Sequence, residues 1–227
     1  MAPPANDLQY ILMLIGQQLE DFVHVQTGSP DYPAFVAQTW PPSVVIPYLN
    51  LGLLEAINLK PSCNPVSRTL TLVGGSAQSL PAGDLQLIEV ISNSQGGAVD
   101  SVMQDRIDNL LPNWQAQEWK DNYVQQVILD PRNPKVFYVF PPQPVPPVDK
   151  LNVIVSTTPA LLTADTGIFP LDHSYWPAMV EYGIYRCLKE STTIPNAQAK
   201  ADACYKAFMT GLGIKAEQEQ KVEKEGA

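Results

Sequence analysis

The amino-acid sequence predicts an α+β protein: a four-helix bundle formed by N- and C-terminal helix pairs, with an antiparallel β-sheet or sandwich inserted between the pairs. Apolar residues recur at helical spacing near both ends of the chain, the period changes to that of strands in the middle, and prolines cluster between the patterned segments. We therefore expect a helical bundle domain over 1–62 and 163–213, an inserted β-rich domain over 63–162, and a C-terminal extension over 214–227.

The first helical pair is expected over residues 7 to about 26 and 43 to 59. The first of these helices starts at an Asn6 or Asp7 cap and carries an apolar stripe of Leu8, Ile11, Leu12, Ile15, Leu19, Phe22 and Val23. Ser43 follows two prolines and is the natural N-cap of the second helix, which Lys60 and Pro61 end.

The middle of the chain is rich in branched and aromatic residues in short runs. These runs predict five strands, at 69–73, 86–91, 123–128, 136–140 and 151–156, with a short helix over 101–110. The glycines at 74–75 predict a hairpin turn after the first strand.

The segment from Leu129 to Pro142 is the most distinctive of the chain. Pro131 and Pro134 fix φ and remove two backbone donors, so the lead-in is expected to be a turn. The aromatic run 136–140 is expected to be a strand that the following two prolines end.

The second helical pair is expected from Asp172 to about Glu190 and from Asn196 to Leu212, with glycines at the end of the last helix. Residues 215–227 are charged and rich in glutamine, with nothing to bury. They are expected to be either a solvated helical extension or a tail that orders on a partner.

Composition limits the classes of function. The net charge is −9, which disfavours a nucleic-acid-binding regulator, because affinity for phosphates comes largely from lysine and arginine. The sequence predicts no signal peptide and no membrane span. The three cysteines are widely spaced and are expected to be reduced, buried thiols.

Candidate catalytic residues are sparse, and we expect no enzyme, cofactor or metal. His24 and His173 are the only histidines, and they are expected on a helix surface and at a helix start. A phosphate loop at Gly74 would need the lysine and hydroxyl residue of a Walker motif, which do not follow it. A small hydrolase would need a clustered acid and base, and no motif predicts one.

Several blocks of sequence together resemble the head–tail adaptor (connector) family of tailed bacteriophages. The blocks are Trp40–Pro41, the helix from Ile46 to Pro61, Leu70–Gly75 with Gln78–Pro81, Leu129–Pro142, Ile168–Arg186 and Ala203–Phe208. The resemblance covers roughly residues 8–213. It implies a structural virion protein similar to tail tubular protein A and to head-completion adaptors.

What the resemblance implies is a ring, usually of twelve copies, in the neck between capsid and tail. The expected partners are the portal protein, tail nozzle or tube proteins, and other copies of the chain, while genomic DNA passes through the lumen without specific binding. Assembly is expected in the host cytoplasm, and no membrane is expected to take part. The alternatives are a tail-side completion (terminator) ring and a small tail-associated hydrolase.

The C-terminal extension is the expected portal-docking segment. Its charged side chains are the candidate contacts: Lys215, Glu217, Glu219, Lys221, Glu223 and Lys224. In this hypothesis the extension threads into a crevice of the portal and becomes ordered there.

Overall fold

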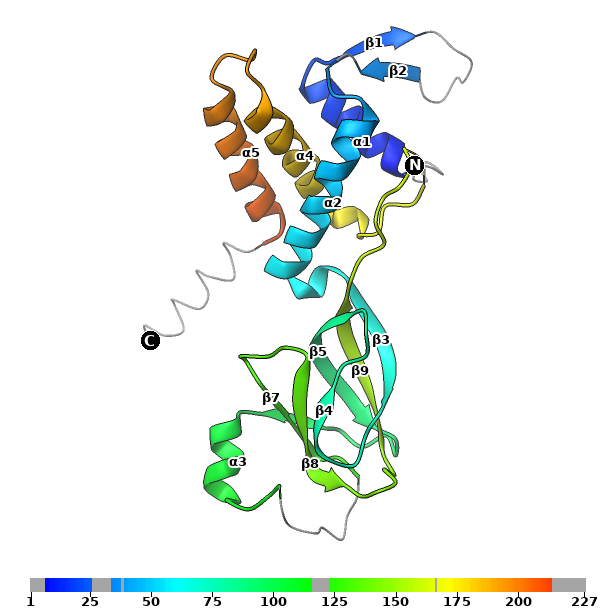
Figure 1. The fold of residues 1–227 in the computed structure, drawn as a ribbon, viewed down its shortest axis with the longest axis vertical. Helices are drawn as coiled ribbons and strands as arrows, with labels where there is room; N and C mark the ends of the chain where they lie inside the picture. The colour runs from blue at the N-terminus through cyan, green and yellow to red at the C-terminus, as the bar shows by residue number, and fades with distance from the viewer. Residues whose placement is uncertain (1–6, 26–33, 38, 116–122, 166, 214–227) are drawn as a thin grey trace. The chain divides into compact units, whose positions relative to one another are not determined.

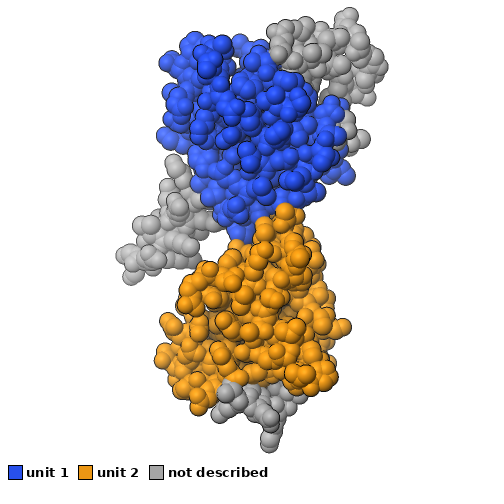
Figure 2. Space-filling view, in the orientation of Figure 1, with its two compact units in different colours: residues 1–63, 159–227 blue, residues 64–158 orange. Residues whose placement is uncertain are grey.

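The computed structural model of the chain describes residues 7–25, 34–37, 39–115, 123–165 and 167–213. The chain divides into two compact units, which Figure 2 shows in different colours. Residues 1–63 and 159–227 form the helical unit, and residues 64–158 form the β-rich unit.

The helical unit contains four longer helices, a β-hairpin and two 3-10 turns among its described residues (Figure 1). In chain order these are α1 (Asp7–Gln18), β1 (Phe22–Val25), β2 (Ala34–Ala37), α2 (Pro42–Leu59), η1 (Pro61–Cys63), η2 (His173–Tyr175), α4 (Trp176–Glu190) and α5 (Ala197–Gly211).

Helix α4 is the centre of the helical unit, because α1, α2 and α5 each pack against it. The helices and sheets together make the chain an α+β protein. The contacts of α4 with its three neighbours do not show the four-helix bundle expected from the sequence. Gly183 explains the close approach of α1 and α2 to α4. A Cβ atom at this glycine would lie 2.5 Å from Cδ1 of Ile15 and 3.5 Å from Cδ2 of Leu49.

Helix α1 is shorter than predicted, since it ends at Gln18 and the chain then forms the β1–β2 hairpin. The helical spacing of apolar residues continues past this point, but Glu20 has a positive φ of 53°, which a helix does not accommodate. The buried Asp21 accepts hydrogen bonds from the backbone N–H groups of Thr39 (2.8 Å) and Trp40 (2.6 Å). His24 consequently lies on strand β1 and not on a helix surface.

Helix α2 begins at Pro42, one residue before the predicted cap at Ser43. Pro42 occupies the first helical position, where its missing N–H costs nothing, and the carbonyl of Pro41 accepts from Val44 (2.8 Å). Pro47 lies inside the helix, beyond the first turn.

The described residues of the β-rich unit form two sheets and one short helix. Its elements are β3 (Pro65–Thr71), β4 (Gly75–Ser79), β5 (Asp84–Asn93), β6 (Asp100–Val102), α3 (Gln104–Leu110), β7 (Gln126–Leu129), β8 (Val136–Gln143) and β9 (Lys150–Thr157). One sheet has the strand order β3-β9-β5 and the other β4-β8-β7-β6.

The two sheets of the β-rich unit share one hydrophobic core. Leu87, Val153 and Val155 of the first sheet belong to the same buried cluster as Phe137 and Val139 of the second. All strand pairs are antiparallel except β6–β7, which are parallel. The prediction of an antiparallel sheet or sandwich is therefore wrong at this edge, where the chain crosses over through α3 before it returns.

Three local predictions in the β-rich unit need correction. The short helix predicted over 101–110 is present and ends at Leu110, but it begins only at Gln104 because residues 100–102 form β6. Glycines 74–75 lead from one sheet to the other and do not close a hairpin between paired strands. Strand β8 continues through Pro141 and Pro142, which fall where the pairing with β4 is interrupted between Tyr138 and Gln143, so no N–H is needed there.

Candidate functional site

Two of the three predicted buried thiols are buried in the structure. All three cysteines are free; Cys63 and Cys187 are buried and Cys204 is half-buried. Burial raises the pKa of Cys63 to about 11 and that of Cys187 to about 12. Burial and a hydrogen bond to Glu181 raise the pKa of Cys204 to about 11. Because the thiolate is the reactive form, these thiols are unreactive near neutral pH.

Within the described residues, no cluster of three or more histidine, cysteine, aspartate or glutamate side chains is arranged to hold a metal ion. His173 lies in η2 and stacks on Trp176, with ring centroids 4.0 Å apart. Stacking of this kind positions the start of α4.

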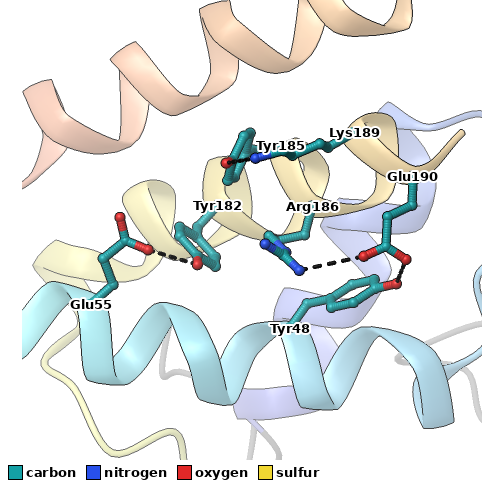
Figure 3. Close-up of polar contacts among 7 residues, drawn as sticks. All are labelled: Tyr48, Glu55, Tyr182, Tyr185, Arg186, Lys189 and Glu190. Carbon is teal, nitrogen blue, oxygen red and sulfur yellow. Dashed lines mark hydrogen bonds and ion pairs between the residues drawn. The ribbon is translucent and has the colours of Figure 1, made fainter.

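A group of polar side chains joined by hydrogen bonds and an ion pair links α2, α4 and α5 in the helical unit. We call it the polar layer, and it consists of Tyr48, Glu55, Tyr182, Arg186, Glu190 and Tyr205. Tyr182 of α4 donates to one carboxylate oxygen of Glu55 on α2 (2.8 Å, Figure 3), and Tyr205 of α5 donates to the other (2.7 Å). A single carboxylate therefore ties three helices together.

The other half of the polar layer joins α2 to the end of α4. Tyr48 of α2 donates to Glu190 of α4, and the same carboxylate forms an ion pair with Arg186 (3.4 Å, Figure 3). The Arg186 guanidinium also lies 5.3 Å from the centre of the Tyr48 ring, where a cation–π contact is favourable.

The tyrosines of the polar layer stay protonated over the physiological range of pH. The hydrogen bond to Glu190 raises the pKa of Tyr48 to about 12, and the hydrogen bond to Glu55 raises that of Tyr205 to about 12. Burial, followed by the hydrogen bond to Glu55, raises the pKa of Tyr182. These phenols are therefore permanent donors, which suits a structural role and not proton transfer.

A second candidate surface lies at one end of the β-rich unit. Three connections form it, residues 72–75, 93–97 and 143–149, and we call it the loop end. Side chains buried inside this end hold its backbone, and the residues that face outward are largely valine, proline and glycine.

Asp149 is the main anchor of the loop end and is only 2% exposed. Its carboxylate accepts three backbone hydrogen bonds, from Ser94 (2.9 Å), Val124 (2.7 Å) and Lys150 (2.7 Å). Its own backbone N–H donates to the side chain of Gln143 (3.1 Å). One buried carboxylate thus holds connections 93–97 and 143–149 to each other and to the segment that leads into β7.

Two buried amides complete the frame of the loop end. Asn93 donates to the carbonyl of Val124 (3.0 Å) and accepts from the N–H of Gly97 (2.9 Å). Gln78 pairs with both the N–H and the carbonyl of Val73, each at 2.8 Å. These bonds replace the ladder partners that the turn backbone lacks, so the loop end is a fixed surface.

The outer surface of the loop end is apolar. Val73, Val145 and Val148 are exposed by 58%, 88% and 50%. Gly74 allows two of the connections to touch, because a Cβ atom there would lie 2.4 Å from Cγ2 of Val145. Exposed apolar side chains on a rigid frame are typical of a surface that docks on another protein.

The sequence did not single out Glu55 or Asp149 as functional residues. The tyrosines that surround Glu55 come from positions 127 and 150 residues away in the chain, so no local pattern predicts the polar layer. The predicted portal contacts, Lys215, Glu217, Glu219, Lys221, Glu223 and Lys224, lie outside the described residues.

Comparison with known proteins points to one family. A family model described as SU10 adaptor protein matches residues 18–224 of the chain. A search of curated proteins gives no match.

Proposed function

The chain belongs to the SU10 adaptor protein family, a family of phage head–tail adaptors, and we propose that it forms a ring below the portal that connects the portal to the tail and lines the DNA channel. The ring has twelve copies in this proposal. The match to the family over residues 18–224 is the observation that carries it.

The chemistry of the chain supports a structural role at the head–tail junction. A closed ring needs two different complementary surfaces on each subunit. The net charge of −9 keeps phosphates from adhering to the wall of a channel, because like charges repel. The thiols are unreactive, and the tyrosines of the polar layer act as fixed hydrogen-bond donors.

We assign residues 214–227 and the loop end to different partners. Residues 214–227 follow α5 directly, and in this proposal their charged side chains contact the portal. The loop end of the β-rich unit, with its exposed valines and fixed backbone, is the surface that we assign to the adjoining tail component. Both assignments are consistent with an adaptor, which has to bind unlike partners on its two sides.

Deletion of residues 214–227 is expected to weaken attachment to portal-filled heads by about tenfold or more, since every proposed portal contact lies in that segment. The thermal unfolding of the protein is expected to be unchanged, because the buried core found in the described residues lies entirely outside the deleted segment. Attachment is measured by co-sedimentation with heads, and the midpoint of unfolding by circular dichroism.

A control variant replaces residues 214–227 with a glycine-serine segment of the same length, and it is expected to behave like the deletion. Full attachment of the deleted protein would contradict the docking role of the segment. Binding of the intact protein to tail proteins but not to the portal would favour a tail-side completion ring. Binding to neither would contradict the adaptor proposal and favour the alternative of a small tail-associated hydrolase.

A further inference from the structure

The outward side of α2 carries no charge along its length. Five exposed residues form this α2 outer face, with spacings of three or four that place them on one side of the helix: Ser43, Pro47, Leu51, Leu54 and Asn58. The exposed fraction is 47% for Leu51 and 39% for Leu54. The opposite side of the helix is buried core, with Leu49 and Leu53 fully covered.

An open groove runs beside the α2 outer face and has a volume of about 530 Å³. Ser43, Pro47 and Leu51 line one side of it, and Leu162 lines the other. Asn50 fixes that other side, because its side chain donates to the carbonyl of Leu162 (3.0 Å) and accepts from the N–H of the same residue (2.8 Å). The groove is therefore built into the fold and is not formed by a loosely held side chain.

Helix α1 resembles α2 in this respect. Within the described part of the chain, its exposed residues also carry no charge. Its exposed side chains are Gln9, Gln17 and Gln18, with Met13 and Leu14 half-buried between them, and its one acidic residue, Asp7, is buried. By contrast, α4 and α5 expose Lys189, Glu190, Lys200, Asp202 and Lys206.

We propose that the α2 outer face packs against α1 of a second copy of this chain. The inference rests on the ring proposed above and names one of its lateral contacts. Contact between two different helices is heterologous, which is the kind of contact that generates rings. Each copy carries a net charge of −9, so a contact between two uncharged faces avoids the repulsion that the acidic surfaces of two copies would otherwise add.

The chemistry of the two faces is complementary. Leu51 and Leu54 offer apolar area for Met13 and Leu14, and no ion has to lose its water when these faces meet. Pro47 has no N–H to donate to the carbonyl of Ser43, one turn earlier, and a glutamine amide of the neighbouring α1 is a suitable donor to it. A basic or nucleic-acid partner would instead require charged side chains on this face.

A membrane is the main competing occupant. The α2 helix is long and apolar enough to cross a membrane by length and composition alone. Its buried inner side, however, is part of the core of the helical unit, and a core helix passes the same test.

Site-specific photo-cross-linking in the full-length chain tests the proposal. A benzophenone amino acid is placed at Leu54, with the exposed Ala207 of α5 as the matched control position, and the chain is illuminated after assembly on the cognate portal. The expected product is a dimer of this chain from position 54 only, with the cross-linked peptide falling in residues 7–18 of the partner copy. A cross-link from position 54 to another protein, or to a different segment of the second copy, would overturn the assignment.

A charge variant provides an independent readout. Leu51→Asp is expected to reduce the recovered ring by about tenfold or more, because it places an unpaired carboxylate in the contact, whereas Leu51→Asn is expected to reduce it much less. Equal ring yields from Leu51→Asp and the unaltered chain would overturn the proposal, as would flotation of the unaltered chain with phosphatidylglycerol vesicles. A ring from the unaltered chain without the expected cross-link refutes only this contact, whereas no ring on the portal refutes the proposed function and this contact with it.

Discussion

Replacement of Asp149 by alanine is expected to lower the free energy of unfolding of the β-rich unit by about 3 kcal/mol or more, because three backbone N–H groups lose their acceptor. Loss of the acceptor costs most at the backbone N–H of Val124, because this residue is fully buried and water cannot replace the carboxylate. The measurement is urea unfolding of the full chain, together with hydrogen exchange at the amides of residues 94, 124 and 150.

The matched control for this variant is Asp105→Ala, which removes an exposed carboxylate from the first turn of α3 in the same unit. We expect it to change the free energy of unfolding by less than about 1 kcal/mol. Asp149→Asn is expected to fall between the two, because the amide keeps one acceptor oxygen. Equal effects of Asp149→Ala and Asp105→Ala would show that Asp149 does not hold the loop end.

Asp149→Ala is expected to affect one of the two binding surfaces of the adaptor and not the other. Connections 93–97 and 143–149 would no longer be fixed relative to each other and to the segment that leads into β7. A surface that must order before it binds loses affinity. Binding to the tail component is therefore expected to weaken in a variant whose helical unit is intact, while binding to the portal is expected to be retained.

Phe208→Ala is expected to have the largest effect in the helical unit, with a loss of about 3 to 5 kcal/mol. Phe208 is fully buried, and its ring centre lies 4.9 Å from that of Tyr182 and 5.9 Å from that of Tyr205. The other buried side chains within α5 are the alanines at 197 and 201, so Phe208 is the one large side chain that this helix buries fully.

Loss of the Phe208 ring would release the helix that leads into residues 214–227. We expect hydrogen exchange to rise along α5 before the rest of the helical unit opens, and attachment to portal-filled heads to fall with it. Phe208→Leu keeps much of the apolar volume and is expected to cost clearly less, and Lys206→Ala at an exposed position serves as the matched control. Unchanged exchange in α5 of Phe208→Ala would contradict this account of how α5 is attached.

The polar layer explains why α5 would not be lost entirely in that variant. Tyr205 still donates to Glu55, and Lys60 still donates to the carbonyl of Leu212 at the end of α5 (2.8 Å). A cation at the carboxyl end of a helix is favourable for the helix dipole. These remaining hydrogen bonds are expected to hold α5 only weakly, so that α5 opens locally while the rest of the helical unit stays folded.

Sequence patterns predicted the helices of this chain better than their ends. The apolar stripes that run through Leu49 and Leu53 and through Met179 and Val180 predict α2 and α4, and both helices lie where these stripes are. The stripe of α1 continued to Val23, yet the residues from Phe22 onward also suit a strand, and the hairpin was missed because spacing alone does not distinguish the two.

Sequence patterns did not predict which strands far apart in the chain pair with each other. The parallel contact of β6 with β7 brings together segments separated by α3, and no local signal marks it. The sequence predicts that Pro141 and Pro142 end a strand, whereas β8 accommodates them because β4 does not pair with that stretch. Glu55 and Asp149 are single acidic residues in unremarkable surroundings, and only the fold brings their donors to them.

The proposed ring can be seen in a three-dimensional cryo-electron microscopy reconstruction of the virion neck. We expect a ring of copies of this chain directly below the portal, with residues 214–227 against the portal and the loop end against the next tail component. A neck in which another protein occupies that position, with this chain elsewhere or absent, would contradict it.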